Sequence, residues 1–202
     1  MGQCFPVTQS AGADRRPNNF RGTVLPETVL AIDPATRTGF ARGAVGGKPM
    51  LESANFGRER DNHADIFGRA TKWFARLLAK ERFDFVIIEE ALPPSEIWGR
   101  THYSTTAISH GLRGIFLGQA AAYGLRVAEA PIRTWRKYSL GAGNLKREDA
   151  KRAALQLCKN LHWPAVDDNA AEAAAIWLYG CSLLAPARTT RHEPLFLAGG
   201  AG

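Results

Sequence analysis

The sequence predicts one α/β domain in which a mixed five-stranded sheet is flanked by helices. Three observations predict this fold class. Short β-rich segments separated by turn residues come first, a nearly uninterrupted apolar run follows at residues 83–89, and segments with helical spacing then alternate with a further β-rich segment. Three antiparallel strands followed by parallel αβ units give a mixed sheet with helices on its faces.

The first three strands are expected at residues 28–32, 38–45 and 50–56. The first of these segments is β-rich and ends at Asp33-Pro34, as expected of a buried strand. Gly and Pro residues at positions 46–49 supply the turn between the second strand and the third. The three segments are therefore expected to form an antiparallel meander.

Helices and strands alternate in the rest of the domain. Residues 62–82 carry apolar side chains at helical spacing, and the apolar run at 83–89 is typical of a central strand covered on both faces. A helix at 105–123, a strand at 125–130, a helix from Pro131, a helix ending at Asn160 and a last helix ending near Leu184 are expected to follow. Asn144, after a glycine-containing loop, is the expected cap of the helix that ends at Asn160.

The predicted domain occupies residues 27–185. Residues 1–26 are rich in Gly, Pro, Asn and Arg and lack periodicity, which predicts a flexible N-terminal arm. Residues 186–202 are expected to form an irregular C-terminal tail.

Composition limits the classes of function. The chain has 202 residues, 45% of them hydrophobic and 22% charged, as in an ordinary globular domain. Its net charge of +7 is compatible with a nucleic-acid partner. Three separated cysteines without a CxxC pair argue against a disulfide framework or a zinc site and agree with a reducing cytoplasm, or a host cytoplasm for a viral protein. No signal peptide, membrane span or organic cofactor site is indicated.

Acidic residues fall where a shared site would need them. Asp33 and Glu89 each end an apolar strand, so both side chains leave the same edge of the sheet if the two strands are neighbours. Asp168 and Glu172 lie four residues apart on the last helix and share one face of it. Clustered carboxylates repel one another, and Mg²⁺ or Mn²⁺ relieves that repulsion. Two such ions would activate a water molecule and stabilise the leaving oxygen of a phosphodiester.

Each acid also has a simpler interpretation. An Asp before Pro is common in turns, a Glu at the end of a buried strand needs only solvent or a partner, and acids in the first turn of a helix are favoured by the helix dipole. The combination of the four positions is more specific than any one of them.

Several segments carry a family resemblance. Residues 31–40 (AIDPATRTGF) resemble the first-strand motif of RuvC-type Holliday junction resolvases, and residues 86–90 (VIIEE) resemble the second motif of that family, an apolar strand ending in Glu. Further similar segments are the GQA at 118–120, the glycine-containing loop at 141–146 and the closing acidic helix at 168–176. The resemblance covers residues 28–184, with the motifs in the family's order.

The resemblance implies a ribonuclease H-like fold of the retroviral integrase superfamily, a homodimer, and Mg²⁺-dependent paired nicks in a four-way DNA junction. Two ions per site are expected, with Mn²⁺ as a substitute. The resemblance assigns metal binding and catalysis to Asp33, Glu89, Asp168 and Glu172.

The sequence departs from the family at several positions. Glu172 stands where Asp is usual, and Ala35 replaces the usual Gly after Pro34. A spacing of three residues, common in bacterial members, would pair Asn169 with Glu172, whereas Asp168 has the spacing of four. Asp167 lies on a different helix face. These departures indicate a phage-like or otherwise divergent member.

Other residues are candidates for contacting DNA. Lys146 is expected to hold or stabilise the scissile phosphate, with a solvated surface lysine as the alternative. Trp98 and Tyr103 flank the loop after Glu89 and could stack on an unpaired base, or fold back on the core. Arg113 and Arg147 belong to a basic second half that would contact the DNA backbone, whose other members are Arg126, Arg133, Arg136, Lys137, Lys151 and Arg152.

The preferred interpretation is therefore a structure-selective endonuclease that resolves four-way junctions. One alternative is a less selective nuclease of the same fold that acts on flaps, forks or RNA–DNA hybrids. The other is a catalytically weak DNA-binding module, against which the retained acids argue. The apolar face of the helix from Thr105 is the expected dimer contact.

Overall fold

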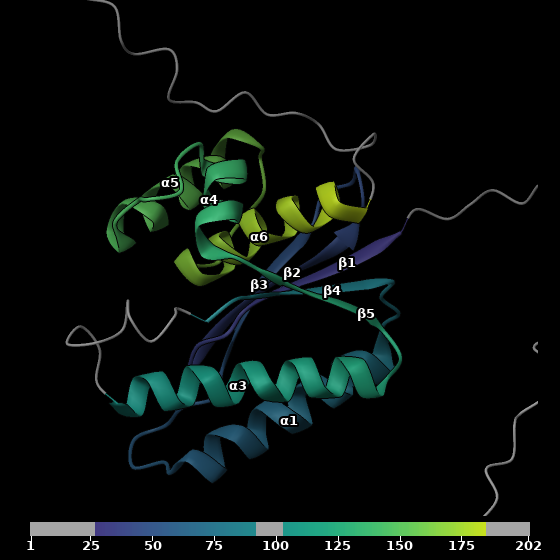
Figure 1. Cartoon of the computed structure of the whole chain (residues 1–202), viewed down its shortest axis with the longest axis vertical. Helices are drawn as coiled ribbons and strands as arrows, with labels where there is room; N and C mark the ends of the chain where they lie inside the picture. Colours follow the sequence, from purple (N-terminus) through teal and green to yellow (C-terminus); the bar gives the residue numbers. More distant parts are fainter. Residues whose placement is uncertain (1–26, 92–102, 185–202) are drawn as a thin grey trace, which may run out of the picture.

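The computed structural model describes residues 27–91 and 103–184, which fold into three layers with the sheet between two groups of helices (Figure 1). The strands are β1 (Thr28–Asp33), β2 (Arg37–Ala44), β3 (Met50–Asn55), β4 (Phe85–Glu89) and β5 (Arg126–Ala130). The helices are α1 (His63–Lys80), α3 (Tyr103–Ala122), α4 (Ile132–Leu140), α5 (Arg147–Asn160) and α6 (Asp168–Leu184).

The sheet has the strand order β3-β2-β1-β4-β5. Strands β1, β2 and β3 pair antiparallel, and β4 pairs parallel with both β1 and β5. The predicted fold class, a mixed sheet with three antiparallel strands followed by parallel αβ units, is therefore confirmed. None of the helices in the described ranges is both long and apolar enough to cross a membrane.

Helices α1 and α3 cover one face of the sheet, and α4, α5 and α6 cover the other (Figure 1). Because side chains alternate along a strand, Leu30 and Ile32 of β1 face α1 and α3, whereas Val29 and Ala31 face α6. Asp33 follows in this alternation and ends the strand on the α6 side.

Helix α6 lies close to the sheet because small residues form the contact. Five alanines between positions 170 and 175 are fully buried there. Opposite them, a Cβ atom added to Gly39 of β2 would lie 2.0 Å from the carbonyl oxygen of Asn169. Gly180 makes a second close approach, since a Cβ there would lie 2.7 Å from Cγ2 of Ile87. This packing carries the first turn of α6 to the ends of β1 and β4.

One predicted cap is wrong. Lys146, in an extended conformation, precedes the first turn of α5, and no side-chain hydrogen bond caps this helix, so Asn144 does not do so. Glu148 and Asp149 in the first turn supply the negative charge that a helix N-terminus favours. The predictions for residues 1–26, for residues 186–202 and for Trp98 fall outside the described residues.

Candidate metal centre

Strand register places Asp33 beside Glu89. The last paired residues of β1 and β4 are Ile32 and Ile88, so the next residue of each strand is one of these acids. Both acids continue the alternation of Ala31 and Ile87, which face α6, and their carboxyl groups lie within hydrogen-bonding reach of each other. Burial, and then the neighbouring Glu89, raise the pKa of Asp33 well above its usual range. A hydrogen bond between these two carboxyl groups needs a proton, so it forms while one of the two is protonated.

Glu172 joins this pair from α6. It is the one charged residue among the described residues that is buried, at 7% exposure. Burial, and then the charge of Asp33, raise the pKa of Glu172 to about 7. Burial, and then the charge of Glu172, raise the pKa of Glu89 to about 7 as well. The three acids thus form one group whose negative charges repel one another; we call Asp33, Glu89 and Glu172 the acid triad.

Two neighbouring residues of α4 support the acid triad. The indole Nε1 of the fully buried Trp135 donates to Oε1 of Glu89 at 3.1 Å and fixes the direction of that side chain. The guanidinium of Arg136 lies 3.7 Å from Oε1 of Glu172, and its charge lowers the pKa of all three acids. Arg136 also donates to the carbonyl oxygen of Leu145 at 3.2 Å, which ties this arginine to the loop before α5.

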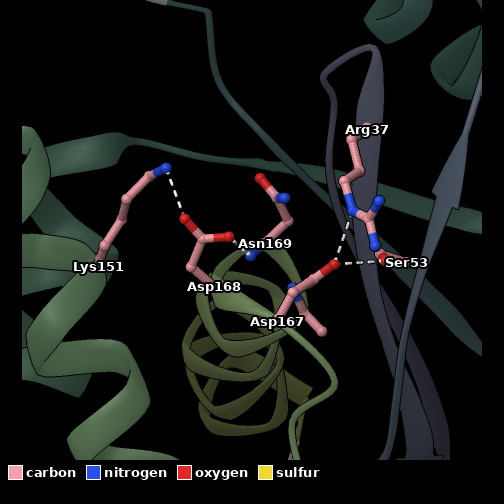
Figure 2. A network of polar contacts seen from close by, with 7 residues as sticks. Arg37, Ser53, Lys151, Asp167, Asp168 and Asn169 are labelled. Atoms are coloured by element: carbon pink, nitrogen blue, oxygen red, sulfur yellow. Dashed lines mark hydrogen bonds and ion pairs between the residues drawn. The ribbon is translucent and has the colours of Figure 1, made fainter. Parts of the chain in front are cut away.

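Asp167 and Asp168 point in opposite directions (Figure 2). Asp168 accepts a hydrogen bond from Nζ of Lys151 at 2.6 Å, which is the main cause of its lowered pKa. Asp167 instead accepts from Arg37 at 2.8 Å and from Ser53 at 2.6 Å, and its other oxygen caps α6 through the backbone N–H of Ala170. Asp168 therefore binds a lysine of α5, whereas Asp167 binds residues of β2 and β3.

The acid triad has the donor chemistry that a hard divalent cation requires. Carboxylate oxygens are the ligands that Mg²⁺ and Mn²⁺ prefer, and a divalent cation relieves the repulsion that raises these pKa values. Within the described ranges, however, no three His, Cys, Asp or Glu side chains converge as a ready metal-binding set. While one of them is protonated, Asp33 and Glu89 can share that proton, and Glu172 is turned to Arg136. Binding a cation would require that proton to leave and Glu172 to turn from the arginine.

The structure does not bring every residue expected at the site to the acid triad. Arg147, in the first turn of α5, lies close enough for its charge to lower the pKa of Asp33. Lys146 is exposed, and its side chain makes no hydrogen bond or ion pair to a described residue. Arg113 pairs with Glu129 of β5, on the α3 side of the sheet. Tyr103 begins α3, and its side chain lies outside the description.

Three residues at the site were not assigned these roles from the sequence. Arg136 and Lys151 were recognised only as part of the basic second half of the chain, and Trp135 was not singled out. The position of Lys151 four residues after Arg147 places both on one face of α5, and this spacing was the available signal. No sequence pattern indicated the hydrogen bond from Trp135 to Glu89.

Comparison with solved structures identifies the fold. The RuvC of T. thermophilus in complex with a Holliday junction substrate matches with a TM-score of 0.58 and 20% identity, over 75% of this chain and 90% of the other. A second Thermus thermophilus RuvC structure matches with a TM-score of 0.55 and 20% identity, over 74% and 90%. The yeast mitochondrial Holliday junction resolvase Ydc2 matches with a TM-score of 0.54 and 13% identity, over 82% and 86%.

These matches establish that the chain has the ribonuclease H-like fold of RuvC-type resolvases. No protein-family model matches the sequence, and no curated protein matches it. The likeness therefore lies in the fold.

Proposed function

We propose that this protein is a divalent-cation-dependent endonuclease that cleaves branched DNA and resolves four-way junctions. The observation that carries the proposal is the acid triad at the ends of two parallel strands, in a fold shared with Holliday junction resolvases. One of the structures that share the fold is a complex with a Holliday junction substrate, which supports branched DNA as the partner.

In this proposal, Asp33, Glu89 and Glu172 hold the cation, with Mg²⁺ as the natural ion and Mn²⁺ as a substitute. The cation would activate a water molecule and stabilise negative charge on the phosphate. Trp135 keeps the Glu89 carboxylate directed to the site. Arg147, exposed and close to Asp33, is placed to contact the DNA backbone beside the scissile bond, and this makes it a better candidate than Lys146.

Paired, symmetrical nicks belong to the same proposal and require two copies of the chain. A four-way junction has two-fold symmetry, so a homodimer would present one acid triad to each of two opposing strands. The resemblance of the motifs to RuvC-type resolvases supports this part.

The proposal is tested by incubating the purified full-length chain with Mg²⁺ and three substrates: an immobile four-way junction, a linear duplex of the same sequence and an RNA–DNA hybrid. We expect paired nicks in the junction and little cleavage of the other two. Asp33→Asn should lower the rate at least about a thousandfold, because it removes a charge that holds the cation. Glu59→Gln, which changes an exposed acid outside the triad, is the matched control and should cleave normally.

Other outcomes separate the alternatives. Comparable cleavage of linear duplex or hybrid would favour a less selective nuclease of the same fold. Binding of junctions without cleavage, unchanged by Asp33→Asn, would favour a DNA-binding module.

A further inference from the structure

Both carboxylate oxygens of Asp168 already accept hydrogen bonds from other groups of the chain. Nζ of Lys151 lies 2.6 Å from Oδ2 of Asp168, and Oδ1 accepts a hydrogen bond from the backbone N–H of Asn169 at 3.1 Å. The side chain of Lys151 is 19% exposed and that of Asp168 is 34% exposed, so this ion pair is partly shielded from solvent. Figure 2 shows the ammonium of Lys151 directed at this carboxylate.

The residues on either side of Asp168 do not take its place as a carboxylate ligand for a cation. Asn169 carries no charge, and Asp167 is bound to Arg37 and Ser53 on the far side of the helix end (Figure 2). Within the triad, Asp168 acts on Glu172, whose pKa its charge raises. The N-terminal part of α6 therefore offers the triad Glu172, while Asp167 and Asp168 are held by cations outside the triad.

The charges of the site balance with a single divalent cation. Asp33, Glu89, Asp168 and Glu172 carry four negative charges when ionised. Lys151 cancels one of them through a short ion pair, and Arg136 cancels another from 3.7 Å. Two negative charges remain, or one when Arg147, whose charge lowers the pKa of Asp33, is also counted. One divalent cation is enough to neutralise them, and a second would leave an excess of positive charge in a partly buried site.

We propose that Lys151 takes the place of a second cation: the acid triad holds one divalent ion, and the ammonium of Lys151 supplies positive charge at Asp168. This inference rests on the proposed function and departs from the two ions per site that the family resemblance implies. It makes Lys151 a positioning residue that determines the number of ions.

Calorimetric titration of the full-length chain with Mn²⁺ at pH 8 tests the inference. The native protein should bind one Mn²⁺ per chain. Lys151→Met frees Asp168 and should raise the stoichiometry to two. The double variant Lys151→Met, Asp168→Asn should return it to one. Lys159→Met, which removes an exposed lysine from the same helix, is the matched control and should leave it at one.

A second pair of variants tests the inference without changing Lys151. Asp168→Asn should change the affinity for the single Mn²⁺ by less than about threefold, whereas Glu172→Gln should weaken it at least about tenfold. A tenfold loss in Asp168→Asn would make Asp168 a ligand of that ion and overturn the inference.

The outcomes distinguish this inference from the proposed function. Two Mn²⁺ ions in the native protein, or one in both the native protein and Lys151→Met, would overturn the role of Lys151 and leave the nuclease proposal standing. An absence of Mn²⁺ binding in every protein would overturn the metal site itself, and the lysine inference with it.

Discussion

Helices α1 and α3 contact one face of the sheet through large aromatic side chains, whereas α6 contacts the other face largely through alanine. On the α1 and α3 face, the rings of Phe40, Phe56, Trp73, Phe74 and Phe116 contact one another in edge-on or tilted pairs. On the α6 face, the alanines at 170–175 and Gly39 allow backbone to approach backbone. The first arrangement buries large apolar surfaces, and the second brings acidic side chains together.

The difference teaches how the molecule tolerates its acid triad. Carboxylates that are buried beside one another destabilise a fold, because their charged forms lose solvation and repel. Large apolar side chains on the opposite face, each of which contributes about 1.5–3 kcal/mol on burial, offset that cost. The acid triad thus lies on one face of the sheet only, whereas both faces bury large side chains, with Trp135 and Trp177 on the α6 face.

The largest effect on stability is expected on the aromatic face. Phe116 is fully buried, with its ring 5.1 Å from that of Phe74. Phe116→Ala leaves a cavity and should lower the free energy of unfolding by about 3–5 kcal/mol. Urea denaturation measures it, with the exposed Leu155→Ala as the control, expected within about 0.5 kcal/mol of the native protein. An equal loss in both variants would contradict the tight packing of Phe116 in this aromatic cluster.

The next effect concerns pH and belongs to the acid face. Glu89 and Glu172 have pKa values raised from 4.5 to about 7, so between these values the folded chain binds more protons than the unfolded chain. Stability therefore falls as pH rises through this range, and the Tm without divalent ions should drop by roughly 5–10 °C between pH 5 and pH 8. The lowered pKa values of Asp167 and Asp168 act below this range.

Differential scanning calorimetry checks the pH effect. Mg²⁺ should recover part of the lost Tm at pH 8 and little of it at pH 5, where the acids are protonated. Glu172→Gln, which cannot ionise, should flatten the pH dependence. A Tm that is constant or rises with pH in the absence of Mg²⁺ would show that the triad is not buried together.

A smaller loss is expected where α6 meets β2. Gly39→Ala places a methyl group against the Asn169 carbonyl oxygen, so the first turn of α6 must move. We expect a loss of about 1–3 kcal/mol in the free energy of unfolding, together with weaker Mn²⁺ binding because Glu172 moves with the helix. Gly68→Ala in α1, where an added Cβ has open space, is the control and should not destabilise the protein. Unchanged Mn²⁺ affinity in Gly39→Ala would show that the metal site does not depend on the position of α6.

The smallest effect is expected at Arg37. Its ion pair with Asp167 joins β2 to the N-terminus of α6, but the Arg37 side chain is 57% exposed and solvent weakens the attraction. Arg37→Gln should therefore cost less than about 1 kcal/mol in urea denaturation, with the loss reduced further in high salt. A cost above about 2 kcal/mol would mean that this contact, and not the alanine packing, holds α6 in place.

Much of the fold could be predicted because the strand patterns are local. Apolar runs that end in Asp33 and Glu89 indicated buried strands with acids at one edge, and strand pairing in parallel register placed these acids together. The alanines after Asn169 are a pattern typical of a helix that lies close to a sheet, as α6 does. Each of these features follows from side-chain size and periodicity within one segment.

The rest depends on tertiary placement, which a local pattern does not encode. Asp168 and Glu172 share a helix face, yet α5 presents Lys151 to the first of them and the sheet presents Asp33 and Glu89 to the second. Arg113 appeared as a candidate DNA contact because its partner, Glu129, is distant in the sequence. Asn144 appeared as a cap because its side chain suits one, but the helix begins three residues later.

The opposite directions of Asp167 and Asp168 fix how the first turn of α6 is rotated about the helix axis. One residue turns a helix by about 100°, so an insertion between Asp168 and Glu172 would swing Glu172 out of the triad while Asp168 kept its lysine. An insertion before Asp167 would instead be absorbed by the non-helical segment that follows His162. Natural length variation, and loop grafts made by protein engineers, should therefore be tolerated at residues 164–166, after Trp163, which packs against Trp177, and rejected at 169–171.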